Sequence, residues 1–335
     1  MKRINVAIAG LGSIGRKVAE LLYARQEHYA RSYGVDLRLV AVCGSRAGRA
    51  DSQGLSATDL EQLLPGQCGP DFILGAEPHI LIEAGPTDIR TGQPGLDYIG
   101  PALDRGIHCI VVSKGALVAA GSRLREKAAA NGARLKISGA TAAALPTIDI
   151  LEHGLLGCEI HSIEGILNAT TNYLLSAMVE DRLSLQEAVL RAQGRSMMES
   201  DPSKDIEGWD TAAKLLILAN FGMAAELSLA DVAVEGIQHL TLETIDDWRA
   251  QGKVPRLIGR VTRQDNGFLA TVRVEPVAAD DVFALVSGKT KALRIKTDVM
   301  GEIISIGTAS EPTGTAAAAL KDLEHILSER TVGTR

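Results

Sequence analysis

Aromatic residues and cysteines are scarce in this sequence. Phe, Trp and Tyr together make up 3% of its 335 residues, too few for the stacking platforms with which many proteins hold single-stranded nucleic acid. The four cysteines are widely spaced and include no CxxC pair. This spacing argues against a zinc site and indicates buried free thiols in a reducing compartment. We therefore expect neither a nucleic-acid partner nor a metal site.

Long basic runs and long apolar runs are also missing. The net charge is −6, which argues against a partner with a phosphate backbone. No window approaches the roughly 18 apolar residues that a membrane-spanning helix needs. The apolar run that follows Met1 to Arg3 is short and broken by glycine, unlike that of a signal peptide. The sequence thus predicts a cytoplasmic protein without a membrane partner.

What is present is the composition of an ordinary globular protein. Hydrophobic residues make up 46% of the chain and charged residues 23%, and the length suggests about two domains. Strand and helix patterns alternate over residues 1–138, which predicts a Rossmann-type α/β domain with a doubly wound parallel sheet. We expect a second domain, of the α+β class, over residues 139–306. A helix at about 307–335 is expected to pack back on the first domain.

The chain begins with a strand that leads into closely spaced glycines. The β-branched run 4–9 precedes the pattern GxGxxG, and helical spacing follows it. In a dinucleotide site the first glycine makes the turn, the second admits a pyrophosphate, and the third packs helix on strand. The helix start adds free N–H groups for the phosphates. The residues expected to bind the cofactor here are Gly10, Gly12, Ser13, Ile14 and Gly15; a merely structural turn is the alternative.

The end of the second predicted strand, 37–43, bears on the choice between NAD and NADP. An NAD site carries an acid at this point to accept hydrogen bonds from the ribose hydroxyls. This chain has Ser45 and Arg46 instead, and a hydroxyl with a guanidinium suits a 2′-phosphate. We therefore predict NADP, with NAD as the alternative. A solvated loop position for Arg46 stays open.

Two further predicted strands, 79–85 and 107–114, end in candidate cofactor residues. Gly85 ends the first strand, and Ser113 and Lys114 end the second. The carboxyl ends of strands in an open parallel sheet face the cofactor crevice. Lys114 is therefore either a residue that meets nicotinamide and substrate or a plain loop cation.

Polar residues gather at a predicted strand-to-helix junction in the second half. Residues 168–172 contain two Asn and two Thr. One of them is expected to cap the following helix. Because a cap uses only one such side chain, Asn168 and Thr170 are also candidates for a ligand-facing role.

Acidic residues gather around a proline-containing turn within residues 199–214. Asp210 and Lys214 in this stretch are four positions apart, so they share one face of a helix. Such pairs are common on solvated helix starts. The alternative is a substrate site that presents a carboxylate and an amine together.

In combination, these motifs resemble homoserine dehydrogenases. The glycine pattern, the run from Glu83 to Asp88, Ser-Lys-Gly at 113–115 and Gly-Ile-Leu-Asn-Ala-Thr-Thr-Asn-Tyr at 165–173 occur in that family's order. The most specific match is Glu-x-Asp-Pro-x-x-Asp-x-x-Gly-x-Asp-x-x-x-Lys, from Glu199 to Lys214. The similarity covers nearly the whole chain and is to the short form, which has no regulatory domain.

The resemblance implies interconversion of L-homoserine and L-aspartate 4-semialdehyde by hydride transfer with NAD(P), in threonine and methionine biosynthesis. It also implies a homodimer, with residues 139–306 as the substrate-binding and dimerisation domain. Lys214 and Lys114 are the implied proton-transfer residues, and a lysine suits that task when burial or a nearby cation lowers its pKa. Carboxylates suit the substrate ammonium. The implied substrate-binding residues are Asn168, Thr170, Glu199, Asp205 and Asp210.

Several positions depart from the family pattern. Ser113 stands where Asn is usual, and the run 138–146 has lost an acid and both glycines, so a monovalent-cation site is doubtful. Met197-Met198 and the run 308–311 also differ. Two alternatives therefore stay open: a related oxidoreductase for another hydroxy or oxo acid, and a non-catalytic dinucleotide sensor. An aspartate-semialdehyde dehydrogenase would need a cysteine nucleophile beside a histidine, which no motif here supplies.

Overall fold

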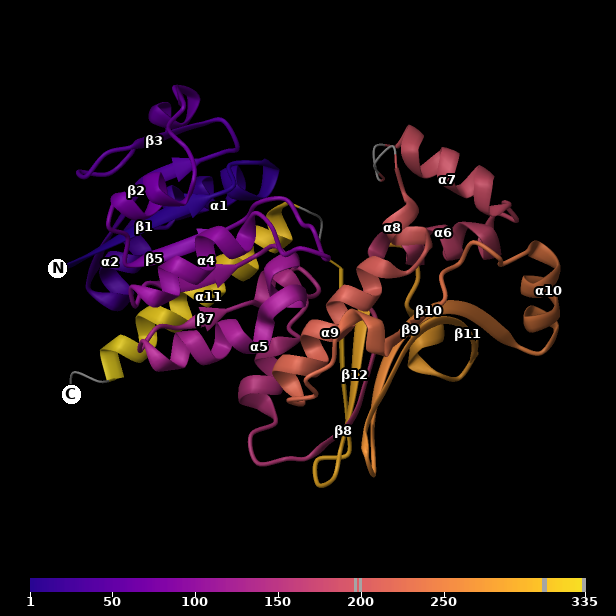
Figure 1. Ribbon diagram of the computed structural model, residues 1–335. Helices are drawn as coiled ribbons and strands as arrows, with labels where there is room; N and C mark the ends of the chain where they lie inside the picture. The colour runs from indigo at the N-terminus through magenta and orange to yellow at the C-terminus, as the bar shows by residue number, and fades with distance from the viewer. Residues whose placement is uncertain (196–197, 199–200, 309–311, 333–335) are drawn as a thin grey trace. The chain divides into compact units, whose positions relative to one another are not determined.

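The computed structural model describes residues 1–195, 198, 201–308 and 312–332. The chain forms two compact units. The first comprises Met1–Ala144 and Ser310–Arg335, and the second comprises Leu145–Ala309. Each unit is described by itself below (Figure 1).

The first unit is built on a sheet with the strand order β4-β3-β2-β1-β5-β6-β7. Its parallel strands are β1 (Lys2–Ala9), β2 (Val35–Cys43), β5 (Ile80–Glu83), β6 (His108–Val111) and β7 (Leu135–Lys136). The strands β3 (Ala47–Ala50) and β4 (Leu64–Pro65) add an antiparallel edge. The chain runs from β1 to β2 on one side and returns to β5 on the other side of β1, which makes the β1/β5 boundary a topological switch point.

Helices cover both faces of this sheet. One group comprises α1 (Ser13–Ala24), α2 (Gln26–Tyr33) and α11 (Thr313–Val332); the other comprises α3 (Pro70–Gly75), α4 (Gly95–Asp104) and α5 (Gly115–Ala130). Alternation along β6 separates the two groups. Ile110 belongs to the core under α11, whereas the thiol of its neighbour Cys109 faces the carbonyl of Ile99 in α4. The predicted doubly wound α/β fold is confirmed.

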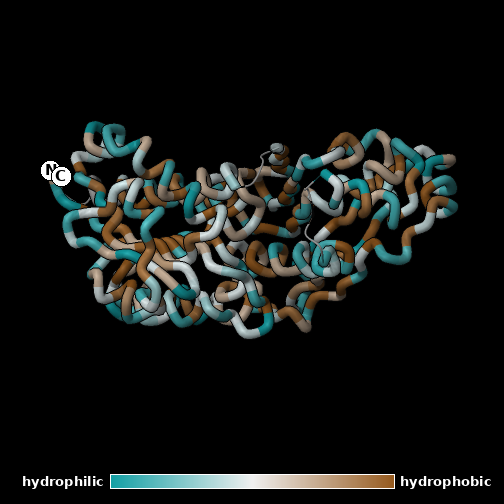
Figure 2. The backbone as a smooth tube through the Cα atoms, turned by 90° about the horizontal axis from the view of Figure 1, so that it is seen from above, coloured by the Kyte–Doolittle hydropathy of each residue, from teal (hydrophilic) through white to brown (hydrophobic). Residues whose placement is uncertain are grey.

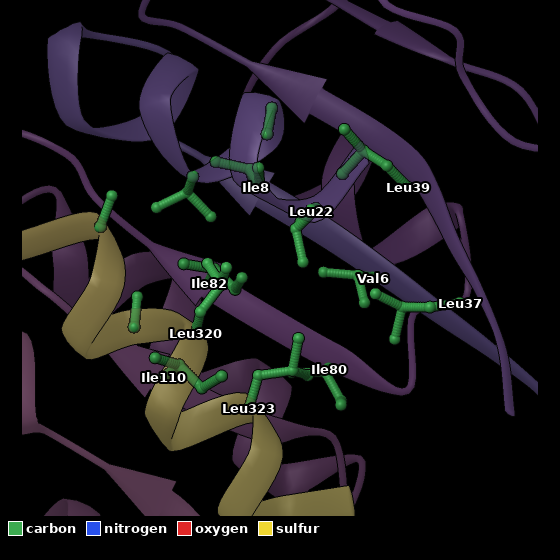
Figure 3. Packing of buried hydrophobic residues seen from close by; sticks show 14 of the residues in the cluster. Val6, Ile8, Leu22, Leu37, Leu39, Ile80, Ile82, Ile110, Leu320 and Leu323 are labelled. Atoms are coloured by element: carbon green, nitrogen blue, oxygen red, sulfur yellow. The ribbon is translucent and has the colours of Figure 1, made fainter. Parts of the chain in front are cut away.

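The core of the first unit ties the C-terminal helix to the sheet. Leu320 and Leu323 of α11 lie against Ile80, Ile82 and Ile110 of the central strands (Figure 3). All five side chains are at most 1% exposed. Burial of each such side chain stabilises the fold by roughly 1.5–3 kcal/mol. Helix α11 is therefore an integral part of the first unit.

The second unit has a sheet with the strand order β13-β12-β8-β10-β11-β9. Its strands are β8 (Ile160–Ile166), β9 (Val232–Val234), β10 (Lys253–Gln264), β11 (Gly267–Ala278), β12 (Lys291–Thr297) and β13 (Glu302–Gly307). Its helices are α6 (Ala169–Glu180), α7 (Leu185–Gly194), α8 (Ser203–Ile206), α9 (Trp209–Gly222) and α10 (Leu242–Ala250). A hairpin turn at Asp265-Asn266 joins β10 to β11, with Gln264 opposite Gly267.

Helix α9 lies directly on the sheet of the second unit. A Cβ atom on Gly259 of β10 would stand 3.0 Å from Thr211 Cγ2, so glycine allows the close approach. Ten consecutive residues of α9, Thr211 to Asn220, are buried. This all-round burial fixes the helix that carries Asp210 and Lys214.

Short turns complete the two units. They comprise the 3₁₀ helices η1 (Thr58–Glu61), η2 (Ser138–Ala140), η4 (Leu229–Asp231) and η5 (Val282–Leu285), and the π-helix η3 (Ile150–Gly154). No helix in the described part of the chain is long and apolar enough to cross a membrane. Polar and apolar stretches alternate along the backbone (Figure 2).

Candidate active site

The glycine-rich turn lies between β1 and α1. A different physical reason explains the glycine at each of its three positions. Gly10 has φ +101°, and a Cβ there would stand 2.4 Å from Ala84 C and Gly85 N. A Cβ on Gly15 would stand 2.0 Å from Gly10 O, so this glycine packs helix against strand. A Cβ on Gly12 would meet nothing within 4 Å. Open space above Gly12 is what a pyrophosphate requires.

The start of α1 is prepared for an anion. Gly12 is the N-cap residue, and no side chain caps the helix, so N–H groups of the first turn, which holds Ser13 and Ile14, face outward. The turn itself is held in place because Gly10 N and Leu11 N donate to the Cys43 carbonyl at 2.8 and 3.1 Å. The residues present therefore fit the phosphates of a dinucleotide.

Ser45 and Arg46 lie at the tip of the turn between β2 and β3. The turn is closed by Gly44 N, which donates to Ala47 O at 2.8 Å. Both side chains are exposed, and no described acid forms an ion pair with Arg46. The hydroxyl and the guanidinium thus remain available at the carboxyl end of β2.

The carboxyl ends of β5 and β6 are joined by a buried carboxyl group. Glu83 accepts hydrogen bonds from Gly85 N at 2.8 Å and from Ser113 Oγ at 2.6 Å. Lys114 is the N-cap residue of α5, and its N–H donates to Thr87 Oγ1 at 3.3 Å. Gly85, Ser113 and Lys114 therefore lie on one ordered edge beside the switch point.

Asn168 is the centre of a polar cluster in the second unit. Its Oδ1 accepts from Thr171 N at 2.8 Å and so caps α6. Its Nδ2 donates to Asp205 Oδ1 at 2.6 Å and to Asp210 Oδ2 at 2.7 Å. The helix cap and the ligand-facing role considered for this residue are thus compatible, since opposite ends of one amide are used. The amide holds two carboxylates close together.

Lys214 completes this cluster from one turn further along α9. Its Nζ donates to Asp210 Oδ2 at 2.5 Å and to the Leu167 carbonyl at 3.0 Å. The Lys214 side chain is 11% exposed and that of Asp210 is 15% exposed. In such a partly desolvated setting an ion pair interacts more strongly than on a surface. The described cluster thus holds two carboxylates, Asp205 and Asp210, and one ammonium, which contacts Asp210.

Comparisons with known proteins agree on one family. The family model described as homoserine dehydrogenase matches residues 146–323, and the model of the NAD-binding domain of homoserine dehydrogenase matches residues 10–138. Homoserine dehydrogenase of Methanocaldococcus jannaschii is 31% identical over 337 residues, which cover 96% of this chain and 98% of the relative. This chain belongs to the homoserine dehydrogenase family.

Two further relatives support that assignment. The NAD(+)-dependent homoserine dehydrogenase of Pseudomonas canavaninivorans is 31% identical, over 99% of this chain and 98% of the relative. A solved structure from Archaeoglobus fulgidus, assigned provisionally to the same enzyme, has a TM-score of 0.90 and 33% identity over 97% of this chain and 99% of that one. The chain is accordingly an NAD(P)-dependent oxidoreductase of amino-acid biosynthesis that acts on a CH–OH group.

The other predicted site residues of this member of the homoserine dehydrogenase family lie in different surroundings. Thr170 is half-buried in the first turn of α6, while Glu199 lies outside the described residues. Asn172 donates from Nδ2 to the carbonyls of Val286 and Thr290 at 3.1 Å, which is a structural use. A hollow of about 380 Å³ borders the chain between Asp201 and Trp209. The four residues of the polar cluster, Asn168, Asp205, Asp210 and Lys214, do not line this hollow. Its lining consists of Asp201, Pro202, Ser203, Ile206, Glu207, Trp209, Val234 and Gln238.

Two contributors were not predicted as site residues. Glu83 was noted only as part of a motif, although an acid at the end of an apolar strand is itself an unusual signal. The Leu167 carbonyl also escaped prediction, because a main-chain acceptor leaves no trace in the residue type. Both act by fixing other groups in place.

Proposed function

We propose that the chain interconverts L-homoserine and L-aspartate 4-semialdehyde through the cluster around Asn168. The observation that carries the proposal is that one amide holds Asp205 and Asp210 together while Lys214 binds Asp210. Two carboxylates against one lysine leave a net negative charge, which suits a substrate ammonium. Glu199 is proposed to add to that charge.

The proposed chemistry divides the work between carboxylates and lysines. A nicotinamide dinucleotide, when bound, would accept or supply the hydride. The substrate hydroxyl must lose its proton as its carbon loses hydride, and Lys214 and Lys114 are the proposed acceptors. Asp210, which contacts Lys214, is proposed to accept a hydrogen bond from the substrate hydroxyl and so to hold the reacting oxygen in place. Asp205 and Thr170 are proposed to orient the rest of the substrate.

Turnover with L-homoserine tests this proposal. We expect NADPH to form when L-homoserine is added to enzyme and NADP⁺, and Asp205→Asn to lower kcat/KM for homoserine by about 100-fold. Asp201→Asn is the matched control, because Asp201 is exposed on the same segment and accepts from Ser203 N at 3.1 Å. No turnover with either nicotinamide would contradict the proposal.

A panel of hydroxy acids addresses the second candidate, an enzyme of the same type with another substrate. It is favoured by the run 138–146, where Ser138 stands in place of the usual acid and donates from N and Oγ to Asp322 at 2.9 and 2.6 Å. A different hydroxy acid turned over faster than homoserine would establish it.

We further propose a preference for NADP over NAD. The support is the exposed pair of Ser45 and Arg46 at the carboxyl end of β2. Arg46→Ala is expected to lower the affinity for NADP⁺ at least roughly tenfold and to leave that for NAD⁺ unchanged. Arg49→Ala is the control, since Arg49 already binds Asp59 at 2.9 Å. Equal loss for both cofactors would contradict the preference.

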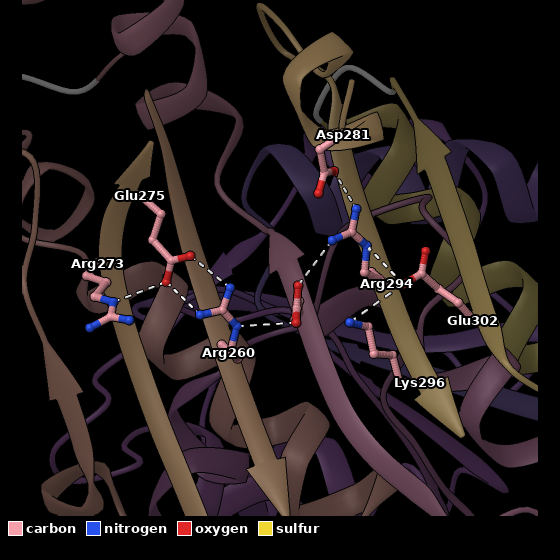
Figure 4. A network of polar contacts seen from close by, with 8 residues as sticks. Arg260, Arg273, Glu275, Asp281, Arg294, Lys296 and Glu302 are labelled. Atoms are coloured by element: carbon pink, nitrogen blue, oxygen red, sulfur yellow. Dashed lines mark hydrogen bonds and ion pairs between the residues drawn. The ribbon is translucent and has the colours of Figure 1, made fainter. Parts of the chain in front are cut away.

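A homodimer is proposed to form on the sheet face opposite α9. A chain of ion pairs crosses this face from Arg273 through Arg260 to Arg294 (Figure 4). On β13, at the edge of the same sheet, Ile304 and Ile306 are 37% and 47% exposed. Exposed apolar side chains beside an already paired charge network suit burial against a second copy.

The mass of the protein in solution tests the dimer. The double variant Ile304→Asp, Ile306→Asp is expected to be monomeric, whereas Leu190→Asp on α7, a more exposed leucine, should leave the mass unchanged.

A cytoplasmic location is likewise proposed, and its support is that all four cysteines are free.

A further inference from the structure

Glu83 is a buried acid whose charge is not balanced by a described cation. It is 1% exposed at the carboxyl end of β5. Its carboxyl oxygens accept from Gly85 N and Ser113 Oγ, and within the described residues neither Lys nor Arg forms an ion pair with it. A Cβ on Gly95, the first residue of α4, would stand 3.5 Å from Glu83 Cδ, so the acid is enclosed by three elements.

Such a group costs the folded protein free energy. An ionised carboxylate buried without a cation loses its hydration, and hydrogen bonds compensate only in part. Burial accordingly raises the pKa of Glu83, against the opposing effect of the hydrogen bonds from Ser113 and Gly85. A glutamine has the same length and would avoid this cost. The acid is therefore best explained by a positive charge that arrives with a ligand.

The position of Glu83 identifies that ligand. The phosphates of the dinucleotide fit the start of α1, and Ser45 and Arg46 lie beyond β2 on one side of it. In this topology the other half of the dinucleotide crosses the switch point toward the carboxyl ends of β5 and β6. Glu83 and Ser113 end those two strands. An oxidised nicotinamide ring carries a positive charge, and a reduced one is neutral.

We propose that Glu83 is a positioning residue of the nicotinamide half of the site whose negative charge favours the oxidised cofactor over the reduced one. Its hydrogen bonds hold Gly85 and Ser113, and Lys114 follows directly. Its charge acts on the ring across this ordered edge without direct contact. The inference rests on the dinucleotide-binding part of the proposed function and does not depend on which hydroxy acid is the substrate.

Equilibrium binding of three ligands tests the proposal. Dissociation constants are measured for NADP⁺, NADPH and 2′-phospho-ADP-ribose, which lacks the nicotinamide. Glu83→Gln is expected to weaken NADP⁺ by roughly tenfold, the size expected for one charge several ångströms away at an intermediate dielectric. The constants for NADPH and for the fragment should stay within about twofold. Ser113→Ala keeps the charge and should leave the ratio of NADP⁺ to NADPH affinity unchanged while kcat falls.

Two further variants keep the test decisive. Glu83→Asp retains the charge, so its affinity ratio should stay near that of the wild type; a ratio that moves as far as with Gln would overturn the proposal. Glu324→Gln is the control for loss of an acid elsewhere in the unit, where Glu324 binds Tyr33 and Arg25. Equal weakening of all three ligands by Glu83→Gln, or no change, would also overturn it. Failure to oxidise homoserine would overturn only the proposed substrate.

Discussion

The two units form their candidate sites from different parts of the chain. In the first unit the contacts come mainly from the backbone: N–H groups at the start of α1, the turn at Gly10, and the open space at Gly12. In the second unit they come from side chains, with Asn168 between Asp205 and Asp210. A site made of backbone is sensitive to residue size, whereas one made of side chains is sensitive to the chemical group.

This difference suits the two partners. A dinucleotide brings a large fixed shape and two phosphates, which repeated N–H groups can hold without any particular side chain. A small hydroxy amino acid has an ammonium and a hydroxyl that must be told apart from similar groups. Under the proposed function, side-chain carboxylates and a lysine at fixed positions would provide that discrimination.

The largest expected effect comes from the lysine of the second unit. Lys214→Met keeps the length of the side chain but removes its charge and its proton, so kcat for homoserine should fall by about 10³-fold or more. The dissociation constant for NADPH, measured by fluorescence, should not change. Lys204→Met, at an exposed position of α8, is the control. Weakened NADPH binding by the Lys214 variant would contradict the proposal that the first unit binds the cofactor and the cluster of the second unit acts on the substrate.

Two alanine substitutions in the glycine turn should have opposite consequences. Gly15→Ala places a Cβ 2.0 Å from Gly10 O and is expected to destabilise the fold by about 3 kcal/mol, measured by urea unfolding. Gly12→Ala places its Cβ in open space and should leave stability within roughly 0.5 kcal/mol. It should nevertheless weaken NADPH binding at least roughly tenfold, because the added methyl group would occupy the space proposed for the phosphates.

If Gly12→Ala binds NADPH normally, the open space above this residue is not where the phosphates lie. If Gly15→Ala is as stable as the wild type, the close packing of α1 on β1 is not needed. Either result would weaken the description of the first unit as a site made by its backbone.

A smaller loss is expected at the amide that joins the carboxylates. Asn168→Ala leaves Asp205 and Asp210 without their shared donor and α6 without its cap. The loss of stability should be about 1–3 kcal/mol, since a cap and buried hydrogen bonds are removed. Thr241→Ala, which removes the cap of α10 and a hydrogen bond to Thr244 Oγ1 but leaves the carboxylates untouched, measures the share of the cap. Equal losses would show that the carboxylates do not depend on the amide.

The glycine turn was predictable from sequence, and the Asn168 cluster was not predictable to the same degree. Gly10 to Gly15 form a local strand, turn and helix in which every step has its own residue signal. Asn168 meets Asp205 and Asp210 across 37 and 42 positions, a distance that no local periodicity spans. Those residues were selected from a charge pair, a polar run and a family resemblance. Their shared amide became visible only in the fold.

Secondary structure shows the same limit. The long strands β10 and β11 and the helices α6, α7 and α9 have apolar patterns strong enough to be recognised from the sequence. The short strands β3, β4 and β9 were not predicted. Each has only two to four residues and owes its extended form to pairing with a neighbouring strand. The antiparallel edge made by β3 and β4 supports the turn that carries Ser45 and Arg46, so its omission concealed how that turn is held.

The buried acid of the first unit should give stability an identifiable pH dependence. Burial raises the pKa of Glu83 in the folded state above its unfolded value. The protonated form therefore stabilises the fold below the unfolded pKa, and that contribution is lost as the pH rises through the folded pKa. Glu83→Gln should thus gain in unfolding free energy relative to the wild type as the pH rises above the unfolded pKa of a glutamate. A difference that stays constant as the pH rises would contradict an ionisable Glu83.

The smallest expected effect concerns the end of the first unit, where backbone conformation again decides. Ala143 has φ +58°, a left-handed conformation that costs an alanine roughly 1 kcal/mol or more relative to glycine. Ala143→Gly is therefore expected to raise the free energy of unfolding by about 0.5–1 kcal/mol, since greater freedom in the unfolded chain offsets part of the relief. Ala142→Gly is the matched control, because Ala142 is not among the residues with positive φ and should lose about that amount. If both variants were less stable than the wild type, the left-handed conformation of Ala143 would not be a source of strain. A gain at 143 with a loss at 142 would extend the rule seen at Gly10 and Gly15, that main-chain geometry governs the first unit.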